Sequence, residues 1–179
     1  MLTVIIECLD QETELAQTLA ALVSGAVEGV VCDVVVLDRG SRDGTSRLAD
    51  AAGCRFHGQW DLKDIVRAAR GEWLLLVEPG ARPASGWIDE IADYVMRNSA
   101  PARFSPSRHH RLPFYRRIGR RTAPLEDGLL LSKRQALAIV KSGMGLGDLP
   151  KGLRMQSLTA ELVPARVARQ ARADLGITE

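Results

Sequence analysis

Short apolar runs alternate with amphipathic stretches along most of the chain, a pattern typical of an α/β protein. Apolar runs rich in β-branched residues predict buried parallel strands, and apolar residues spaced three and four apart predict helices between them. Strands are expected at 2–6, 34–38, 54–56, 73–77, 128–131 and 158–163, and helices at 11–26, 45–52, 62–70, 86–95, 133–142 and 166–175. We therefore expect a mostly parallel sheet flanked by helices in a three-layer sandwich.

The second predicted strand ends on Asp38 and runs into a glycine-rich turn. In open α/β sheets, ligands bind in the crevice beyond the carboxyl ends of the strands. Asp38 would lie at that edge and accept hydrogen bonds from a base N–H or from ribose hydroxyls. Gly40 and Gly44 permit the positive φ values of a tight turn, and Ser41 or Asp43 would cap the next helix. An ordinary strand–turn–helix connection remains the alternative.

Composition narrows the class of protein. The 179 residues suffice for one domain with a sizeable core, and 46% apolar residues with a net charge of +2 indicate a globular chain. The cysteines, Cys8, Cys32 and Cys54, predict buried thiols of a reducing compartment, and their spacing fits no zinc site. No signal peptide is recognisable, and no apolar run approaches the roughly 20 residues of a membrane span. A cytoplasmic location is expected, with peripheral attachment to the inner membrane face left open.

Residues 38–45 read Asp-Arg-Gly-Ser-Arg-Asp-Gly-Thr. This segment resembles the Asp-x-Gly-Ser-x-Asp-Gly-Thr signature of family 2 glycosyltransferases, which are nucleotide-sugar enzymes of the GT-A fold, and Arg39 is its unusual position. The resemblance covers residues 2–90 well and 126–160 weakly. It implies one GT-A-like domain with a nucleotide-sugar-binding half (1–98), a basic loop (99–125) and an acceptor-side half with a C-terminal tail (126–179).

Two further positions on the donor side follow from the resemblance. After the first strand the family has Pro-x-x-Asn-Glu, and Asp10 matches the Asn and would touch the nucleotide. A plain helix cap is the alternative role for Asp10. At the start of the helix at 62–70 the family usually carries an Asn and a Gly near the donor, whereas this chain has Lys63 and Ile65. Lys63 would still point at the diphosphate, with an ordinary exposed lysine as the alternative.

The strand at 73–77 leads into Glu78-Pro79-Gly80, where the family carries Asp-x-Asp. There the two carboxylates hold Mg²⁺ or Mn²⁺ against the donor's pyrophosphate, and no organic cofactor is implied. Only Glu78 keeps a carboxylate here, and a single carboxylate is a poor Mg²⁺ site. Either Arg82, Lys63 or the later basic segment replaces the metal as a phosphate clamp, or catalysis is lost and a binding module remains.

From residue 94 to residue 125 the chain has no acidic residue, whereas arginines accumulate together with His109 and His110. Arginines with interleaved apolar residues suit an anionic membrane surface or a lipid-linked acceptor. Nucleic acid is disfavoured because the basic residues are confined to one segment, and a solvated loop is the bland alternative. The residues expected to contact a membrane or acceptor are Arg108, Arg111, Arg116, Arg117, Arg120 and Arg121.

The acceptor side offers one candidate catalytic residue. Where the family usually carries Glu-Asp, the chain has Gly147-Asp148, so Asp148 is the candidate general base of an inverting transfer. A loop aspartate without a catalytic role is the alternative.

The leading hypothesis is therefore a glycosyltransferase that moves a sugar from a UDP- or GDP-linked donor to an unknown acceptor, with lipid-linked acceptors included. The alternative is a non-catalytic glycosyltransferase-like module that binds a partner or a membrane through its arginine-rich segment. The chain is short for this family, so we expect that acceptor-binding parts are missing or supplied by a partner. The sequence does not specify an oligomeric state.

Overall fold

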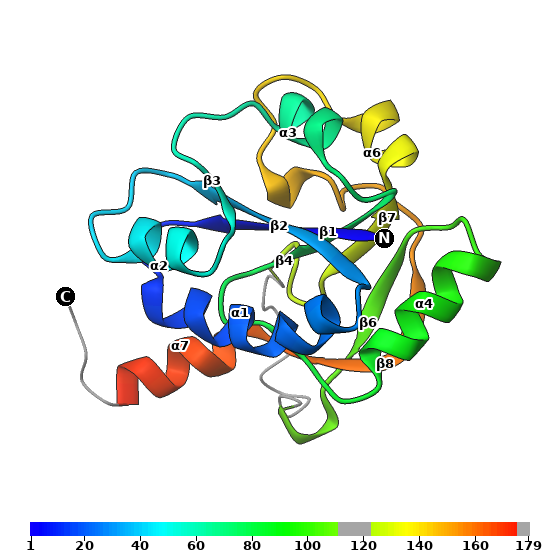
Figure 1. Ribbon diagram of the computed structural model, residues 1–179. Helices are drawn as coiled ribbons and strands as arrows, with labels where there is room; N and C mark the ends of the chain where they lie inside the picture. Colours follow the sequence, from blue (N-terminus) through cyan, green and yellow to red (C-terminus); the bar gives the residue numbers. More distant parts are fainter. Residues whose placement is uncertain (111–122, 175–179) are drawn as a thin grey trace.

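The computed structural model describes residues 1–110 and 123–174. In this part of the chain, eight strands form one sheet in the order β3-β2-β1-β4-β7-β6-β8-β5 (Figure 1). The strands are β1 (Leu2–Cys8), β2 (Val31–Asp38), β3 (Arg55–His57), β4 (Trp73–Val77), β5 (Arg82–Pro83), β6 (Ala102–Pro106), β7 (Leu129–Ser132) and β8 (Gln156–Val163).

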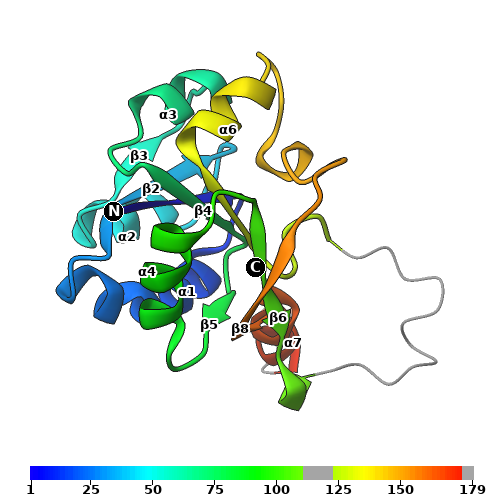
Figure 2. The ribbon, with the colours of Figure 1, turned by 90° about the vertical axis from the view of Figure 1, so that its right-hand side faces the viewer.

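Helices cover both faces of the sheet and give the three layers that the sequence predicts. The α3 and α6 helices lie side by side on one face in both Figure 1 and Figure 2, whereas α1, α2, α4 and α7 lie on the other face. The described helices are α1 (Glu12–Val27), α2 (Thr45–Ala51), α3 (Leu62–Ala68), α4 (Trp87–Arg97), α6 (Lys133–Ile139) and α7 (Ala165–Asp174), with 3₁₀ turns η1 (Arg108–His110) and η2 (Leu146–Asp148).

The strands divide the interior into two apolar cores. Along β1, Val4 and Ile6 join the core beneath α1 and α4, whereas Ile5 joins the core beneath α3 and α6. This alternation follows from the two-residue period of a strand. Both sides of the central strands are therefore buried, which explains why they read as continuous apolar runs rather than as alternating ones.

The order in which the chain connects the parallel strands β1 to β4 determines where a ligand crevice can form. β1 pairs in parallel with β2 on one side and with β4 on the other, with Ile5 opposite Val35 and Leu76. From β1 the chain first adds β2 and β3 on one side of the sheet. It then returns through α3, and β4 is added on the opposite side of β1. The gap between the carboxyl ends of β1 and β4 is therefore a topological switch point, the place where open α/β sheets bind ligands.

The second half of the sheet is mixed. β7 runs antiparallel to β4 and to β6, β5 runs antiparallel to β8, and β6 pairs in parallel with β8. The prediction of an α/β sheet flanked by helices is confirmed, and its continuous parallel part consists of β1 to β4. The loop expected after residue 99 begins with a strand instead, because Ala102 and Phe104 are buried on either side of exposed Arg103. Flanking prolines hide this alternation in the sequence.

Three helix starts differ from the prediction. The N-cap of α2 is Gly44 rather than Ser41 or Asp43, and its φ is −78° instead of positive. The N-cap of α1 is Gln11 rather than Asp10, which adopts a left-handed φ of 51° and directs its carboxylate to another turn. The N-cap of α4 is Gly86 rather than Ser85, because Gly86 supplies a φ of 83° at the turn into the helix.

The predicted capping box of α6 is confirmed, since the Ser132 hydroxyl accepts a hydrogen bond from the Gln135 backbone N–H. That helix ends at Ile139, earlier than the predicted stop at Gly143.

Two broader expectations concern thiols and membranes. Cys8 is buried, Cys32 and Cys54 are half-buried, and all three are free. Within residues 1–110 and 123–174, none of the helices has the length and hydrophobicity that crossing a bilayer requires.

Candidate functional site

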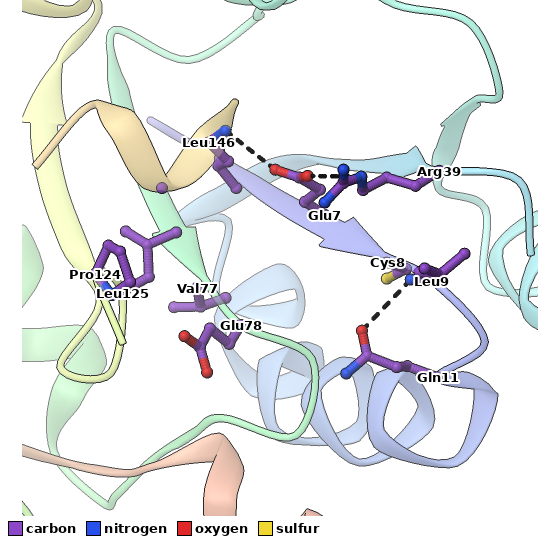
Figure 3. A pocket seen from close by; sticks show the side chains of 11 residues that line it. Glu7, Cys8, Leu9, Gln11, Arg39, Val77, Glu78, Pro124, Leu125 and Leu146 are labelled. Carbon is purple, nitrogen blue, oxygen red and sulfur yellow. Dashed lines mark hydrogen bonds and ion pairs between the residues drawn. The ribbon is translucent and has the colours of Figure 1, made fainter. Parts of the chain in front are cut away.

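A cavity of about 200 Å³ opens at the switch point, beyond the carboxyl ends of β1, β2 and β4 (Figure 3). We call it the strand-end crevice. The described residues that line it are Glu7, Cys8, Leu9, Gln11, Arg39, Val77, Glu78, Pro124, Leu125, Leu146 and Gly147. Its floor is apolar and its rim carries charged side chains, which is the usual make-up of a small-ligand site.

Glu7 and Arg39 form one charged rim of the strand-end crevice. The Glu7 carboxylate accepts a hydrogen bond from the Leu146 backbone N–H at 3.0 Å and pairs with Arg39 Nε at 3.5 Å (Figure 3). The Arg39 side chain is 64% exposed, so this ion pair is weak and the guanidinium can reorient. Sequence reasoning did not assign either residue to the site. The available signals were the position of Glu7 near the end of the first strand and the departure of Arg39 from the family signature.

Asp38 lies beside the strand-end crevice but does not line it. It is 6% exposed, and one carboxylate oxygen accepts hydrogen bonds from the backbone N–H groups of Gly40 and Ser41, at 2.9 and 3.0 Å. The other oxygen accepts from the Ser41 hydroxyl. The backbone carbonyl of Asp38 accepts from the Trp60 indole N–H at 3.1 Å. Asp38 therefore holds the signature turn in shape, since its carboxylate is directed into the turn.

Asp10 ties the turn after β1 to the turn after β2. Its backbone N–H donates to the Ser41 hydroxyl at 2.9 Å, and its carboxylate accepts from the Arg42 backbone N–H at 2.7 Å. Asp10 is predicted to contact the nucleotide, but in the structure its hydrogen bonds join two loops.

Asp43 and Glu12 also join these two loops by hydrogen bonds. The Asp43 carboxylate accepts from the Glu12 backbone N–H at 2.9 Å, and the Glu12 carboxylate accepts from the Gly44 backbone N–H at 3.0 Å. Asp43 also accepts from the Thr45 backbone N–H, which opens α2. Burial acts to raise the pKa of Asp43, but the hydrogen bonds from Thr45 and Glu12 outweigh it and lower that pKa. The signature residues thus fix the relative position of the two loops that border the strand-end crevice.

Glu78, the remaining acid of the Asp-x-Asp position, forms the other rim and pairs with α7. Arg169 donates from both terminal nitrogens to one Glu78 oxygen, each at 3.3 Å. Gly80 has a φ of +93°, and a Cβ placed there would lie 2.8 Å from the Ala168 Cβ. Its backbone N–H donates to the buried Thr18 hydroxyl at 2.7 Å. The α7 helix therefore packs onto the turn that carries the second aspartate in the family.

This arrangement does not fit a divalent cation. Mg²⁺ and Mn²⁺ sites use several oxygen ligands, whereas Glu78 is paired with an arginine and Gly80 has no room for a carboxylate. Within the described ranges, no group of three or more His, Cys, Asp or Glu side chains is placed to hold a metal ion.

Two more arginines anchor α7. Arg172 pairs with Glu14 at 3.3 Å and also donates to the Asp10 backbone carbonyl at 3.3 Å. The Glu14 side chain is only 3% exposed, so this ion pair is largely withdrawn from solvent. Arg166 pairs with Glu126 at 3.1 Å. Together these contacts bind α7 to the first helix and to the loop before β7.

The other predicted donor residues lie apart from the strand-end crevice. Lys63 is exposed on the first turn of α3, and Arg82 lies in β5 opposite Val163 at the edge of the sheet. Neither belongs to the described lining.

Asp148, the candidate base, is adjacent to Gly147 of the lining. Its carboxylate accepts from the Gly145 backbone N–H at 2.9 Å and pairs with Lys151. The hydrogen bond from the Lys151 ammonium, helped by the one from Gly145, lowers the pKa of Asp148. The group is therefore ionised at neutral pH, as a base must be, although it is a weaker base than an unperturbed aspartate.

Of the arginines predicted to contact a membrane or acceptor, Arg108 is described. It lies in η1, largely exposed, and its guanidinium pairs with Glu161 at 3.1 Å. The remaining five lie outside the described residues, namely Arg111, Arg116, Arg117, Arg120 and Arg121.

The fold and the strand-end crevice define a GT-A-like architecture, the class to which nucleotide-sugar glycosyltransferases belong. The chain is similar to glucosyl-3-phosphoglycerate synthase from Mycobacterium tuberculosis solved with Mn²⁺, UDP and glucosyl-3-phosphoglycerate, with a TM-score of 0.60 and 15% identity over 100% of this chain and 81% of that one. It is also similar to the same synthase with Mn²⁺, UDP and phosphoglyceric acid (TM-score 0.54, 17% identity, 75% of this chain) and to a mycobacterial protein (TM-score 0.55, 20% identity, 75% of this chain).

In those two comparisons the chain spans 56% and 54% of the neighbour's length. No family model matches the sequence, and no curated protein matches it. At these identities the comparisons establish the fold. They confirm the predicted GT-A-like sheet flanked by helices.

Proposed function

We propose that this protein is a nucleotide-sugar-dependent glycosyltransferase whose donor binds in the strand-end crevice. The observation that carries the proposal is the position of this cavity at the switch point between β1 and β4, with charged side chains on two rims. Structural neighbours solved with UDP or with UDP-glucose support a donor of this chemical class.

The size of the cavity limits what enters it. At about 200 Å³ it is smaller than the roughly 300–1,000 Å³ of typical ligand pockets. The strand-end crevice therefore receives part of the donor, and the rest extends over the neighbouring loops. The diphosphate is the part that matches the rim, because Arg39 and Glu78 line the cavity and Arg169 pairs with Glu78.

The predicted residues take different roles in this proposal. Asp38 and Asp10 act indirectly, because their hydrogen bonds position the turns that border the donor. Lys63 and Arg82 remain candidate contacts for outlying parts of the donor. Arg108 and the arginines that follow it remain candidate contacts for an anionic membrane or a lipid-linked acceptor.

Asp148 serves as the general base in this proposal. The acceptor hydroxyl loses its proton to the carboxylate while its oxygen bonds to the anomeric carbon, and the bond from that carbon to the diphosphate breaks. Asp148→Asn should then abolish turnover and leave donor affinity unchanged. Lys151→Met should raise the pKa of Asp148 and move the acidic limb of the pH–rate profile upward, which a purely structural aspartate would not do.

A crevice-filling substitution tests the donor site directly. Gly147 lines the cavity and has an ordinary φ, so Gly147→Phe introduces bulk without backbone strain. Gly58→Phe is the matched control, because a Cβ there approaches only Phe56, at 3.9 Å. Calorimetric titration with UDP- and GDP-sugars should show binding to the native protein and to Gly58→Phe, and none to Gly147→Phe. Equal binding by both variants would place the donor elsewhere.

The packing of α7 on Gly80 favours one second candidate, a glycosyltransferase-like module that binds without transferring sugar. Such a module would take up the nucleotide, or attach to membranes through its arginine-rich segment, with no turnover. Donor hydrolysis or transfer measured by release of the nucleoside diphosphate separates the two candidates. Co-sedimentation with phosphatidylserine vesicles, compared with an Arg108→Glu variant, tests the membrane contact of the module.

A further inference from the structure

We infer that Arg39 and Arg169 replace the divalent cation, so that the strand-end crevice binds a nucleoside diphosphate without metal. This inference rests on the proposed function and names the groups that neutralise the donor. The departing nucleoside diphosphate accumulates negative charge, and a fixed cation must stabilise it.

The α7 helix excludes the usual metal ligand. The 2.8 Å separation between a Cβ at Gly80 and the Ala168 Cβ is well inside the 3.5–4.0 Å contact distance of carbon atoms. The same Cβ would lie 3.3 Å from the Ala165 carbonyl oxygen, also on α7, and 3.4 Å from the Glu14 Cβ on α1. An aspartate at this position therefore requires α7 to move away.

The same helix supplies a cation in place of the metal. Arg169 lies one residue beyond Ala168, so the helix that closes the metal position carries the guanidinium to Glu78. Ion pairs before and after Arg169 hold the helix in place, Arg166 with Glu126 and Arg172 with Glu14. Arg169 itself is 43% exposed and spends both terminal nitrogens on a single carboxylate oxygen. A guanidinium has five N–H donors, so it retains capacity for phosphate oxygens.

A second guanidinium, that of Arg39, borders the cavity from the end of another strand. Arg39 follows β2, whereas Glu78 follows β4, and Figure 3 shows the Glu7–Arg39 pair and Glu78 at separate parts of the cavity rim. Arg39 engages Glu7 through Nε at 3.5 Å. Its terminal nitrogens are available to a diphosphate, which two arginines can grip from two sides.

Neutralising Glu78 makes the inference testable, because this substitution has opposite effects on nucleotide binding under metal-dependent and metal-free binding. If Glu78 ligates a metal, removing its charge weakens nucleotide binding. If Glu78 only neutralises Arg169 in the empty protein, removing its charge frees the guanidinium and strengthens binding. Glu7 likewise neutralises Arg39 in the empty protein, so removing the charge of Glu7 should also free a guanidinium for the diphosphate.

The experiment is calorimetric titration of the full chain with UDP and GDP, in EDTA and again with Mn²⁺. Native protein should bind one of them with a Kd that changes less than about twofold between the two buffers. Arg169→Gln and Arg39→Gln should each weaken binding about tenfold, which is the loss of one charge-assisted hydrogen bond. Glu78→Gln should tighten binding. Arg67→Gln is the matched control, since Arg67 is 64% exposed, as Arg39 is, and pairs with Asp64 on α3.

Each remaining outcome decides against one of the two proposals. Binding that requires Mn²⁺, or that Glu78→Gln abolishes in a variant with a native melting temperature, overturns metal-free binding and leaves the donor site intact. Failure of UDP and GDP to bind native protein in either buffer overturns the proposed function itself.

Discussion

Substitution of Gly80 by alanine probes the contact that closes the family's metal position. The new methyl group carries two costs. A left-handed backbone costs an L-residue about 1 kcal/mol, and forcing a methyl group against a packed neighbour costs about 2 kcal/mol. With a φ of +93° and Ala168 at 2.8 Å, Gly80→Ala should therefore lower the free energy of unfolding by about 3 kcal/mol.

Gly86→Ala separates the two costs. Gly86 has a similar φ of +83°, but nothing lies within 4 Å of a Cβ built there. This control should lose only the backbone part, about 1 kcal/mol. In urea denaturation, with a slope of about 2 kcal/mol per molar, the midpoint should fall by about 1.5 M for Gly80→Ala and about 0.5 M for Gly86→Ala.

A double-mutant cycle then identifies the neighbour. Ala168→Gly removes the methyl group that Gly80→Ala strikes, so the double variant should be more stable than the sum of the single losses predicts, by about 2 kcal/mol. Equal midpoints for Gly80→Ala and Gly86→Ala, or strict additivity in the cycle, would show that α7 does not pack on this turn.

Three further predictions concern buried polar groups. Glu14→Gln breaks the shielded pair with Arg172 and should cost about 3 kcal/mol in urea denaturation. Thr3→Val removes the buried hydroxyl that accepts from the Gly71 backbone N–H at 2.8 Å and should cost about 2 kcal/mol. Burial, aided by nearby acids, raises the pKa of the Cys8 thiol from 9.0 to about 12. Its contribution to stability is therefore complete below pH 9 and is lost as the pH rises toward 12, at up to about 1.4 kcal/mol per pH unit.

Each of these predictions has its own control. Asp93→Asn breaks the exposed pair with Arg97 and should change stability by less than about 0.5 kcal/mol. Thr159→Val removes an exposed hydroxyl and should be similarly neutral. Cys8→Ala should flatten the decline of stability above pH 9. An unchanged slope in that variant would mean that the Cys8 thiol titrates normally.

Local chemistry made much of the fold predictable. The apolar run at 34–37 and the capping box at Ser132 depend on neighbouring residues, and the structure contains both as predicted. The strand at 102–106 escaped prediction because flanking prolines mask a short alternation of buried and exposed residues. The parallel and antiparallel pairing of β5 to β8 also escaped prediction, because long-range packing decides which of these strands become neighbours.

The candidate site was predictable in position but not in detail. The signature turn at the end of β2 marks the edge of the sheet at which the strand-end crevice opens, yet the side chains of Asp10 and Asp38 are turned to the loops rather than to the crevice. The Glu78–Arg169 pair joins residues 91 positions apart. Short-range patterns carry no information about such a contact, so the docking of α7 required the structure.

A crystal structure of the protein soaked with UDP and EDTA would show where the donor diphosphate binds and which side chains hold it without metal. The diphosphate should lie in the strand-end crevice, within hydrogen-bonding distance of Arg39 and Arg169. A nucleotide bound at any other place, or a strand-end crevice that stays empty at saturating UDP, would contradict this prediction.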